Sequence, residues 1–550
     1  MTSDMSTQNL TSTDLSEQDR ETVFLYFFRR LTAYRNTIET YALTEAALLR
    51  PSGCFNDSRT LEFSQALNSW GQSILENAWI ACQGPGGGGE LVCPILDPLA
   101  DTTVGELPKT PEERVFTTIT NTVLLLHITT SKQYSAYTRA FLSSLAPIDE
   151  PTVVTALKDP ERVLRKIHRQ AQRVRERHAE SGRALRVAGA GFGAIAGGVL
   201  IGVTGGLAAP LVGAGVAALL GGLGIGGTAV GVLATGLASS SAICGALFGT
   251  YGARSSARMV ERHTKEVSDL AVLPVRTQSN QGTLAVRLCI SGWVSSREDI
   301  TAPWTIFGGD DTFALQWEVE ALQAVSNALR GLTRSLALKY VGVKILKRTI
   351  LASLLSALSP IALIKIGKII DNPWMNARAL ALKTGAVLAE LLASRAFGNR
   401  PITLVGYSLG SLVIFEALRC LTKLSPLKTW GLIQDVFLFG TPVSTNLTTW
   451  SSVRRLVSGR LVNGYCTSDF VLAILSRASD ATWGVAGLQS VDVQGVENVQ
   501  CEGVEGHLQW RGMIGRCLMD CHAPGIVTSE VDSQLETMAE QMELPESGSP

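Results

Sequence analysis

The residue of this chain best placed to do chemistry is a serine between two glycines. Gly406-x-Ser408-x-Gly410 follows an apolar run that begins at Pro401, and a second apolar stretch with helical spacing follows it. This pattern is that of a nucleophile elbow, a strained strand-to-helix turn that exposes a serine hydroxyl. We therefore predict that Ser408 is a nucleophile for acyl carbonyls. The alternative is a strand-turn-helix of an unrelated α/β domain.

A nucleophilic serine needs a histidine that accepts its proton. The chain has six histidines, and His507 and His522 are the two that follow Ser408. His507 lies in a loop after an expected strand over 496–501, whereas His522 lies close to the polar tail. We predict His507 as the base, although a histidine taken alone is more often a loop or core residue.

The histidine in turn needs a carboxylate that orients its ring. Asp469 comes just past an expected strand end, where an α/β-hydrolase places this acid. The competitors are Asp435, at a strand start, and Asp480, in a helix or loop. The chain order Ser408, Asp469, His507 is the order of serine, acid and histidine in that fold.

The oxyanion of such a reaction needs two backbone N–H donors. Leu409 follows the serine at a helix N-terminus, and its N–H is the first candidate. The second is the N–H of Gly292 or Trp293, in the loop after an expected strand over 283–290. A glycine after a strand is also a common turn residue.

These residues require a sheet that carries them. Residues 272–524 read as alternating strands and helices, and we predict an α/β fold, an α/β-hydrolase-like domain. A helix-rich insertion interrupts it over about 320–396. Two apolar parts of this insertion, 338–358 and 361–370, carry interspersed lysines. They are expected to form a lid, interfacial helices or core helices over the sheet.

The part before this domain is predicted to be helical. Residues 1–16 are expected to be disordered and 17–150 to form an α-helical domain. Residues 151–186 are rich in lysine and arginine and predict a basic helix: a short coiled coil, a solvated helix or an arm on anionic lipid. The polar tail, 525–550, is expected to be disordered.

A long uncharged segment lies between the helical and catalytic parts. Residues 187–253 contain no Asp, Glu, Lys, Arg or His, and 20 of these 67 residues are glycine. Since about 20 apolar residues cross a bilayer, we predict a glycine-rich membrane hairpin with helices near 187–207 and 211–235. Residues 237–253 are a third element or its continuation. The alternative is a helical hairpin that packs on the protein itself.

Basic residues border this segment on both sides. The positive-inside rule then predicts that both ends face the cytoplasm, with an even number of spans. The first 20 residues are polar and contain acidic side chains, so we expect no secretory signal peptide and an intracellular membrane. The bordering residues are Arg183, Arg186, Arg254, Arg258 and Arg262.

Composition excludes several other functions. The net charge is zero, which gives no reason to expect a nucleic-acid partner. The ten cysteines are scattered without a CxxC pair, so we expect neither a metal site nor a disulfide framework. The predicted chemistry needs no cofactor. The expected partners are a lipid bilayer and an acyl or lipid-like substrate.

Several short motifs, taken together, resemble the transmembrane and coiled-coil domain-containing protein four family over about residues 149–515. The resemblance implies a membrane-associated protein with an α/β-hydrolase-like C-terminal half. The family's serine, aspartate and histidine positions fall on Ser408, Asp469 and His507. Besides the elbow, the motifs are Asp149-Glu-Pro-Thr-Val-Val, Ile201-Gly-Val-Thr-Gly-Gly-Leu-Ala-Ala-Pro-Leu211, Ala302-Pro-Trp304, Ile370-Asp-Asn-Pro-Trp374, Val457-Ser-Gly-Arg-Leu-Val-Asn-Gly-Tyr-Cys466, Val485-Ala-Gly-Leu488 and Gly506-His-Leu508.

Two functions follow from these observations. The first is a membrane-bound serine hydrolase, like an esterase, lipase or thioesterase, that acts on a lipid-like acyl ester. The second is a non-catalytic membrane tether or trafficking adaptor that keeps the hydrolase scaffold, because a fold does not determine a function. The complete set of serine, aspartate and histidine favours the enzyme.

Overall fold

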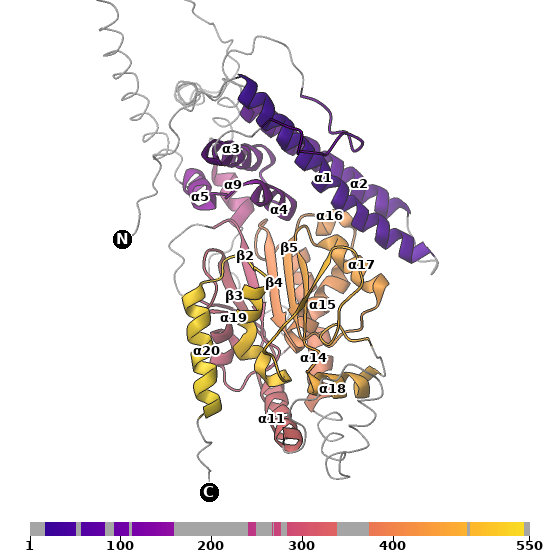
Figure 1. Cartoon of the computed structure of the whole chain (residues 1–550), viewed down its shortest axis with the longest axis vertical. Coiled ribbons are helices and arrows are strands. Elements are labelled where there is room, and N and C mark those ends of the chain that lie inside the picture. Colours follow the sequence, from indigo (N-terminus) through magenta and orange to yellow (C-terminus); the bar gives the residue numbers. More distant parts are fainter. Residues whose placement is uncertain are drawn as a thin grey trace, which may run out of the picture. The chain divides into compact units, whose positions relative to one another are not determined.

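The structure is a computed structural model of the whole chain (Figure 1). It describes residues 17–50, 57–82, 93–108, 113–158, 240–248, 267, 269–276, 283–337, 373–480 and 484–543. The chain divides into two compact units. The helical unit comprises Met1–Arg35, Asn68–Gln133 and Leu142–Leu247, and the sheet unit comprises Asn36–Leu67, Tyr134–Phe141 and Phe248–Pro550.

The N-terminal region is helical, as its apolar spacing predicts. Within the helical unit, the rings of Phe24 and Trp79 meet edge to face with centroids 4.8 Å apart, which joins the first two helices. Side chains such as Leu75 and Val123 are fully buried. The helices of this region are α1 (Glu17–Leu49), α2 (Asp57–Cys82), α3 (Glu113–Ser131), α4 (Ala136–Leu145), α5 (Glu150–Lys158) and α9 (Ser240–Phe248).

The predicted domain boundary at residue 150 needs correction. Residues 36–67 and 134–141 belong to the sheet unit and not to a separate helical domain. The reason lies in their contacts within that unit. The ring of Phe63 packs on Trp430, and the carboxylate of Glu45 pairs with Arg455. Apolar periodicity predicts a helix and its apolar face, but not the element against which that face packs.

The sheet unit contains a seven-stranded, mostly parallel sheet, so the described fold is mixed α/β. The strand order is β1-β3-β2-β4-β5-β6-β7, and β1 alone runs antiparallel to its neighbour. Central strands β2, β4 and β5 are buried along their whole length, which explains their continuous apolar sequences. The strands are β1 (Ala271–Pro274), β2 (Val286–Ile290), β3 (Asp311–Gln316), β4 (Ile402–Tyr407), β5 (Ile433–Phe439), β6 (Leu461–Tyr465) and β7 (Val496–Gln500).

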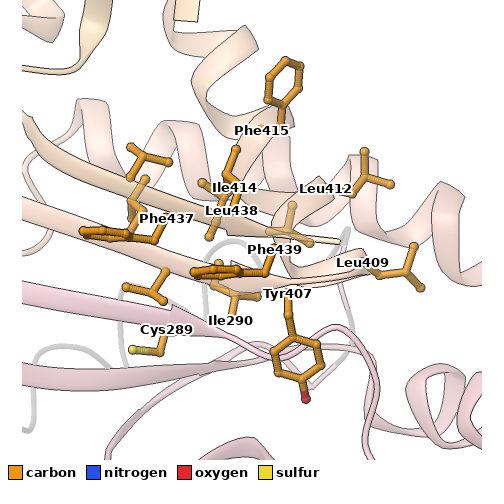
Figure 2. Packing of buried hydrophobic residues seen from close by; sticks show 14 of the residues in the cluster. Cys289, Ile290, Tyr407, Leu409, Leu412, Ile414, Phe415, Phe437, Leu438 and Phe439 are labelled. Atoms are coloured by element: carbon orange, nitrogen blue, oxygen red, sulfur yellow. The ribbon is translucent and has the colours of Figure 1, made fainter. Parts of the chain in front are cut away.

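Helices pack against this sheet and against each other: α15 contacts β2 and β4 and also α14, while α19 contacts β4 and β5 and also α20 (Figure 1). Figure 2 shows apolar side chains of β4, β5 and α15 meeting in the core between them. The helices are α11 (Val319–Ala337), α14 (Met375–Ala393), α15 (Leu409–Leu421), α16 (Pro426–Thr429), α17 (Leu447–Leu456), α18 (Phe470–Asp480), α19 (Trp510–Asp520) and α20 (Thr528–Glu543), with short 3-10 turns η3 (Glu298–Ile300), η4 (Ala302–Trp304) and η6 (His507–Gln509).

The described part of the predicted insertion consists of core helices. Helix α14 approaches α15 so closely that a Cβ at Gly385 would lie 2.7 Å from the Cβ of Glu416 and 2.8 Å from the carbonyl oxygen of Val413. The apolar parts over 338–358 and 361–370 lie outside the described residues.

The expectation of a disordered tail over 525–550 was wrong for most of these residues. Helix α20 occupies Thr528–Glu543, and Val531 on it is fully buried. Leu535 and Met538 also pack against the core. These three residues have helical spacing, and the polar residues between them hide this signal in an average over the segment.

Most of the predicted membrane segment and basic helix lies outside the described residues. Helix α5 covers the start of the basic stretch, and α9 covers nine residues of the uncharged stretch. Among the helices that the structure describes, none combines the length and the apolar character needed to cross a membrane.

Candidate active site

Ser408 lies at the turn from β4 to α15 in a backbone conformation that few residues adopt. Its φ is 53° and its ψ is −126°, and its N–H donates to the carbonyl oxygen of Phe439 at 2.8 Å. Both flanking glycines are needed sterically. A Cβ at Gly410 would lie 2.1 Å from the carbonyl oxygen of Ile290, and one at Gly406 would lie 2.8 Å from a side-chain methyl of α15.

A second serine, Ser411 in the first turn of α15, joins the two central strands, and the sequence analysis missed it. Its hydroxyl donates to the carbonyl oxygen of Gly406 at 2.6 Å and accepts the N–H of Phe439 at 3.1 Å. Because the group is fully buried, these bonds hold the end of β5 against the elbow. Its position in the first turn of the helix after Ser408 was the available signal.

The structure brings the predicted serine, histidine and aspartate together within hydrogen-bonding distance. Ser408 Oγ lies 2.6 Å from Nε2 of His507, and Nδ1 of His507 lies 2.7 Å from Oδ2 of Asp469. With the proton on Nδ1, the ring donates to the carboxylate and its Nε2 accepts the serine proton. This is the arrangement that a serine needs to lose its proton to a neighbouring base.

Parallel strands explain why residues so distant in sequence meet. Ser408 follows β4, Asp469 follows β6, and His507 begins η6 after β7. The carboxyl ends of these strands lie at one edge of the sheet.

The competing candidates lie elsewhere. Asp435 is near the start of β5, where its carboxylate accepts the backbone N–H of Arg460 at 2.7 Å. Asp480 is the last residue of α18. His522 is exposed in the turn after α19. The acid and the base next to Ser408 are therefore Asp469 and His507, and not Asp435, Asp480 or His522.

Asp469 has two further donors, one of which is an indole that the sequence analysis missed. The backbone N–H of Leu472 donates to Oδ1 at 2.9 Å, and Nε1 of Trp510 donates to Oδ2 at 3.0 Å. Gly440 lets this indole approach, because a Cβ there would lie 2.6 Å from Nε1 and its φ is +56°. These donors fix the orientation of the carboxylate.

The loop after β2 lies directly against the elbow. A Cβ at Gly292 would lie 2.1 Å from the carbonyl oxygen of Tyr407 and 2.7 Å from both the N of Leu409 and the Cβ of Ser408. Leu409 is the first residue of α15, so no carbonyl within the helix accepts its N–H. Both predicted N–H sources, Leu409 and the Gly292–Trp293 backbone, therefore lie around the serine.

Three aromatic side chains hold this loop. The indole of Trp304 donates to Oγ of Ser291 at 3.2 Å, and the indole of Trp317 donates to the carbonyl oxygen of Ser291 at 3.3 Å. The phenol of Tyr407 donates to the carbonyl oxygen of Trp293 at 3.1 Å. Burial raises the pKa of Tyr407, which keeps this phenol protonated and able to donate.

The site is closed in this structure. Ser408 and Asp469 have no exposed surface, and His507 is 1% exposed. The indole of Trp374, itself buried, meets the His507 ring edge to face with centroids 6.4 Å apart. An ester therefore reaches Ser408 only after a neighbouring side chain moves.

Other nucleophiles and metal chemistry receive no support from the described residues. Burial raises the pKa of the Cys466 thiol to about 11, and this protonated thiol donates to the carbonyl oxygen of Val504 at 2.8 Å. In the part of the chain that the structure describes, His, Cys, Asp and Glu side chains form no group of three or more suited to a metal ion.

Comparison with known proteins relates the chain to a family of membrane proteins. A family model described as "Protein of unknown function (DUF726)" matches residues 182–522. An uncharacterized membrane protein of Schizosaccharomyces pombe is 35% identical over 439 residues, which is 77% of this chain and 74% of the relative.

Two other relatives share shorter regions. A transmembrane and coiled-coil domain-containing protein of rice (Oryza sativa subsp. japonica) is 39% identical over 328 residues, 58% of this chain and 49% of the relative. A protein of Saccharomyces cerevisiae named as a probable lipase is 35% identical over 302 residues, 54% of this chain and 26% of the relative. The chain thus spans about half and about a quarter of these two relatives. No solved structure matches it significantly.

Proposed function

The chain belongs to the family described as protein of unknown function DUF726, and we propose that it is a serine hydrolase that cleaves lipid-like acyl esters at a membrane. The observation that carries this proposal is the continuous chain of hydrogen bonds from Ser408 through His507 to Asp469. A buried serine with a purely structural role needs neither an imidazole at 2.6 Å nor a carboxylate behind it.

The reaction proceeds in two acyl transfers. Nε2 of His507 takes the proton from Ser408 Oγ as this oxygen attacks the carbonyl carbon, and Asp469 stabilises the imidazolium that forms. The N–H of Leu409 and an N–H of the loop at Gly292 stabilise the oxyanion. His507 then protonates the leaving alcohol. A water molecule, deprotonated by His507, cleaves the acyl-serine and releases the acid.

The arrangement of the sheet also supports a hydrolase. The nucleophile strand is central and parallel to its neighbours, as in an α/β-hydrolase-like domain. An antiparallel strand lies at one edge, and serine, acid and histidine follow in the order typical of that fold. One relative is named as a probable lipase, which agrees with acyl-ester chemistry.

A membrane location follows from two independent features. Relatives in fission yeast, rice and Caenorhabditis elegans are named as membrane or transmembrane proteins. The uncharged, glycine-rich stretch over 187–253 has the composition of a membrane-embedded hairpin. Such an anchor places the site beside acyl substrates.

One observation favours a second candidate, a non-catalytic membrane tether. Ser408 has no exposed surface, so the site as it stands cannot receive a substrate. In a tether, the hydrogen bonds of Ser408 and His507 only stabilise the scaffold, and Ser408→Ala leaves biological function intact.

The proposal is tested by measuring the hydrolysis of a series of acyl esters and thioesters. We expect turnover by the full chain in detergent or liposomes, and its loss in Ser408→Ala. Ser452→Ala is the matched control, because this hydroxyl makes a local bond to the carbonyl oxygen of Thr448 on α17. Turnover by Ser408→Ala at the wild-type rate contradicts the proposal.

A further inference from the structure

A cavity of about 510 Å³ adjoins the catalytic residues within the sheet unit. Its walls come from the loop after β2, the η3–η4 segment, α11, the start of α19 and the C-terminal helix α20. Trp293, which follows Gly292, and Leu508, which follows His507, both line it. The volume lies within the range of small-molecule sites. The cavity is therefore placed to hold the part of a substrate next to the cleaved bond.

Hydrogen-bond donors converge on this cavity. Arg330 and Arg511 line it, and the guanidinium of Arg511 lies 5.1 Å from the centroid of the Trp293 ring. The indole N–H of Trp293 is buried and has no hydrogen-bond partner within the described residues. Because this nitrogen has almost no accessible surface, a ligand in the cavity does not reach it.

The two carboxylates in the lining are already engaged. Asp299 pairs with Arg511 and accepts two backbone N–H groups of its own loop, one at 2.6 Å. Glu530 pairs with Arg276 at 3.4 Å. Arg330 differs from these groups, because it donates to a serine hydroxyl and no described carboxylate pairs with it. The cavity thus retains an arginine available to an anion.

Helix α20 adds a neutral donor to the same wall. Ser533 and Thr537 both line the cavity and are exposed, but the hydroxyl of Thr537 donates to the carbonyl oxygen of Ser533 at 2.9 Å. The hydroxyl of Ser533 is therefore the donor that this helix offers. Hydroxyl groups donate readily to phosphate oxygens. An arginine with a nearby hydroxyl donor is a combination suited to a phosphate group, which arginine binds through parallel hydrogen bonds.

We infer that this cavity binds the phosphate head group of the substrate, so that the cleaved ester is that of a lysophospholipid or phospholipid and not of a neutral acylglycerol. The inference rests on the proposed function for the cleavage step, but the binding of the phosphate can be measured without it. The phosphate oxygens accept from Arg330 and from the hydroxyl of Ser533, and the acyl ester extends toward Ser408.

Binding to the inactive Ser408→Ala chain tests the subsite separately from catalysis. Calorimetry compares hexanoyl glycerol 3-phosphate with hexanoyl glycerol, below their micelle concentrations. We expect the phosphate ester to bind more tightly, and Arg330→Gln to weaken it about tenfold. Glu530→Gln is expected to strengthen it, because this change removes a negative charge from the lining. Arg516→Gln is the matched control, since Arg516 pairs with Asp520 on the same helix outside the cavity.

Turnover by the chain with Ser408 intact provides the second readout. Arg330→Gln is expected to lower about tenfold the ratio of kcat/KM for the phosphate ester to that for the neutral ester. Equal binding of both compounds, or phosphate binding that Arg330→Gln leaves unchanged, would overturn the subsite. Phosphate binding that depends on Arg330, in a chain without turnover of any ester, would contradict the proposed function and the cleavage step but not the phosphate site.

Discussion

At the scale of single residues, the orientation of the Asp469 carboxylate depends on an indole. Oδ2 of Asp469 accepts from both His507 and Trp510, at 2.7 and 3.0 Å. Two donors on one oxygen restrict how the carboxylate can turn, so the imidazole keeps the proton on Nδ1 and leaves Nε2 free to accept. Trp510 does not touch the serine and is a positioning residue.

Replacing this indole should lower the rate of reaction more than substrate binding. We expect Trp510→Phe to reduce kcat about tenfold, since a single hydrogen bond contributes about 0.5–1.5 kcal/mol, with KM nearly unchanged. Trp450→Phe is the control, because Trp450 is also fully buried and its indole donates to the carbonyl oxygen of Ser444 at 2.9 Å. Equal losses of kcat in both variants would show that Trp510 acts only through stability.

The glycines of the elbow provide a steric test. A Cβ at Gly410 would lie 2.1 Å from the carbonyl oxygen of Ile290, which belongs to a central strand and cannot move aside. Gly410→Ala should destabilise the sheet unit by about 3 kcal/mol or more. Gly331→Ala, in helix α11 with open space around its Cβ position, should instead stabilise by about 0.5–1 kcal/mol. Urea unfolding measures both, and a stable Gly410→Ala chain contradicts the packing described.

At the scale of elements, local patterns predicted some features and missed others. The continuous apolar run before Ser408 and the glycines around it predict a buried strand and a tight turn, because both signals are local. Trp510 carries no such signal, and Ser411 has only its position in the first turn of the helix after Ser408. Their roles come from contacts between elements that the sequence does not place side by side. Helix α20 was missed because its apolar residues are few and spaced among charges.

This helix should contribute to the stability of the sheet unit. Val531 is fully buried against the core, so Val531→Ala removes about two buried methylene equivalents and leaves a cavity, at a cost of roughly 2 kcal/mol. Its neighbour Asp532 is exposed, and Asp532→Ala should change the free energy of unfolding by less than about 0.5 kcal/mol. Equal effects of the two substitutions would mean that α20 does not pack as described.

At the scale of the whole molecule, acid should weaken the helical unit. Burial lowers the pKa of His127 from 6.5 to about 4, so the folded chain keeps this ring neutral. The unfolded chain takes up a proton below pH 6.5 and the folded chain does not, so stability falls as the pH drops from 6.5 toward 4, by about 1.4 kcal/mol per unit.

His127→Leu separates this effect from that of other titrating groups. The variant leaves Asn77 bonded to the carbonyl oxygen of Ser73 at 2.7 Å and removes the titrating ring. Hydrogen exchange across α3, at pH 5 and pH 7.5, should show a smaller loss of protection on acidification in the variant than in the wild type. The same loss in both chains would assign the acid sensitivity to other residues.

Access to the buried serine is expected to depend on the membrane. Ser408 is fully buried, while the proposed substrate is a lipid. We expect the serine to react faster in liposomes than in dilute buffer, because a lipid surface favours conformations that expose apolar side chains such as Trp374. The ratio of reaction rates in the two conditions measures this opening, and equal rates would mean that the site opens without lipid.

Labelling of the full chain by a fluorophosphonate, in liposomes, with the modified residue identified by mass spectrometry, tests whether Ser408 is an activated nucleophile. We expect a single phosphonylated residue, Ser408, and no labelling of Ser408→Ala or His507→Ala. Labelling should persist in Ser452→Ala. A folded wild-type chain that stays unlabelled, or that is labelled equally after His507→Ala, would contradict the claim that Ser408 is an activated nucleophile.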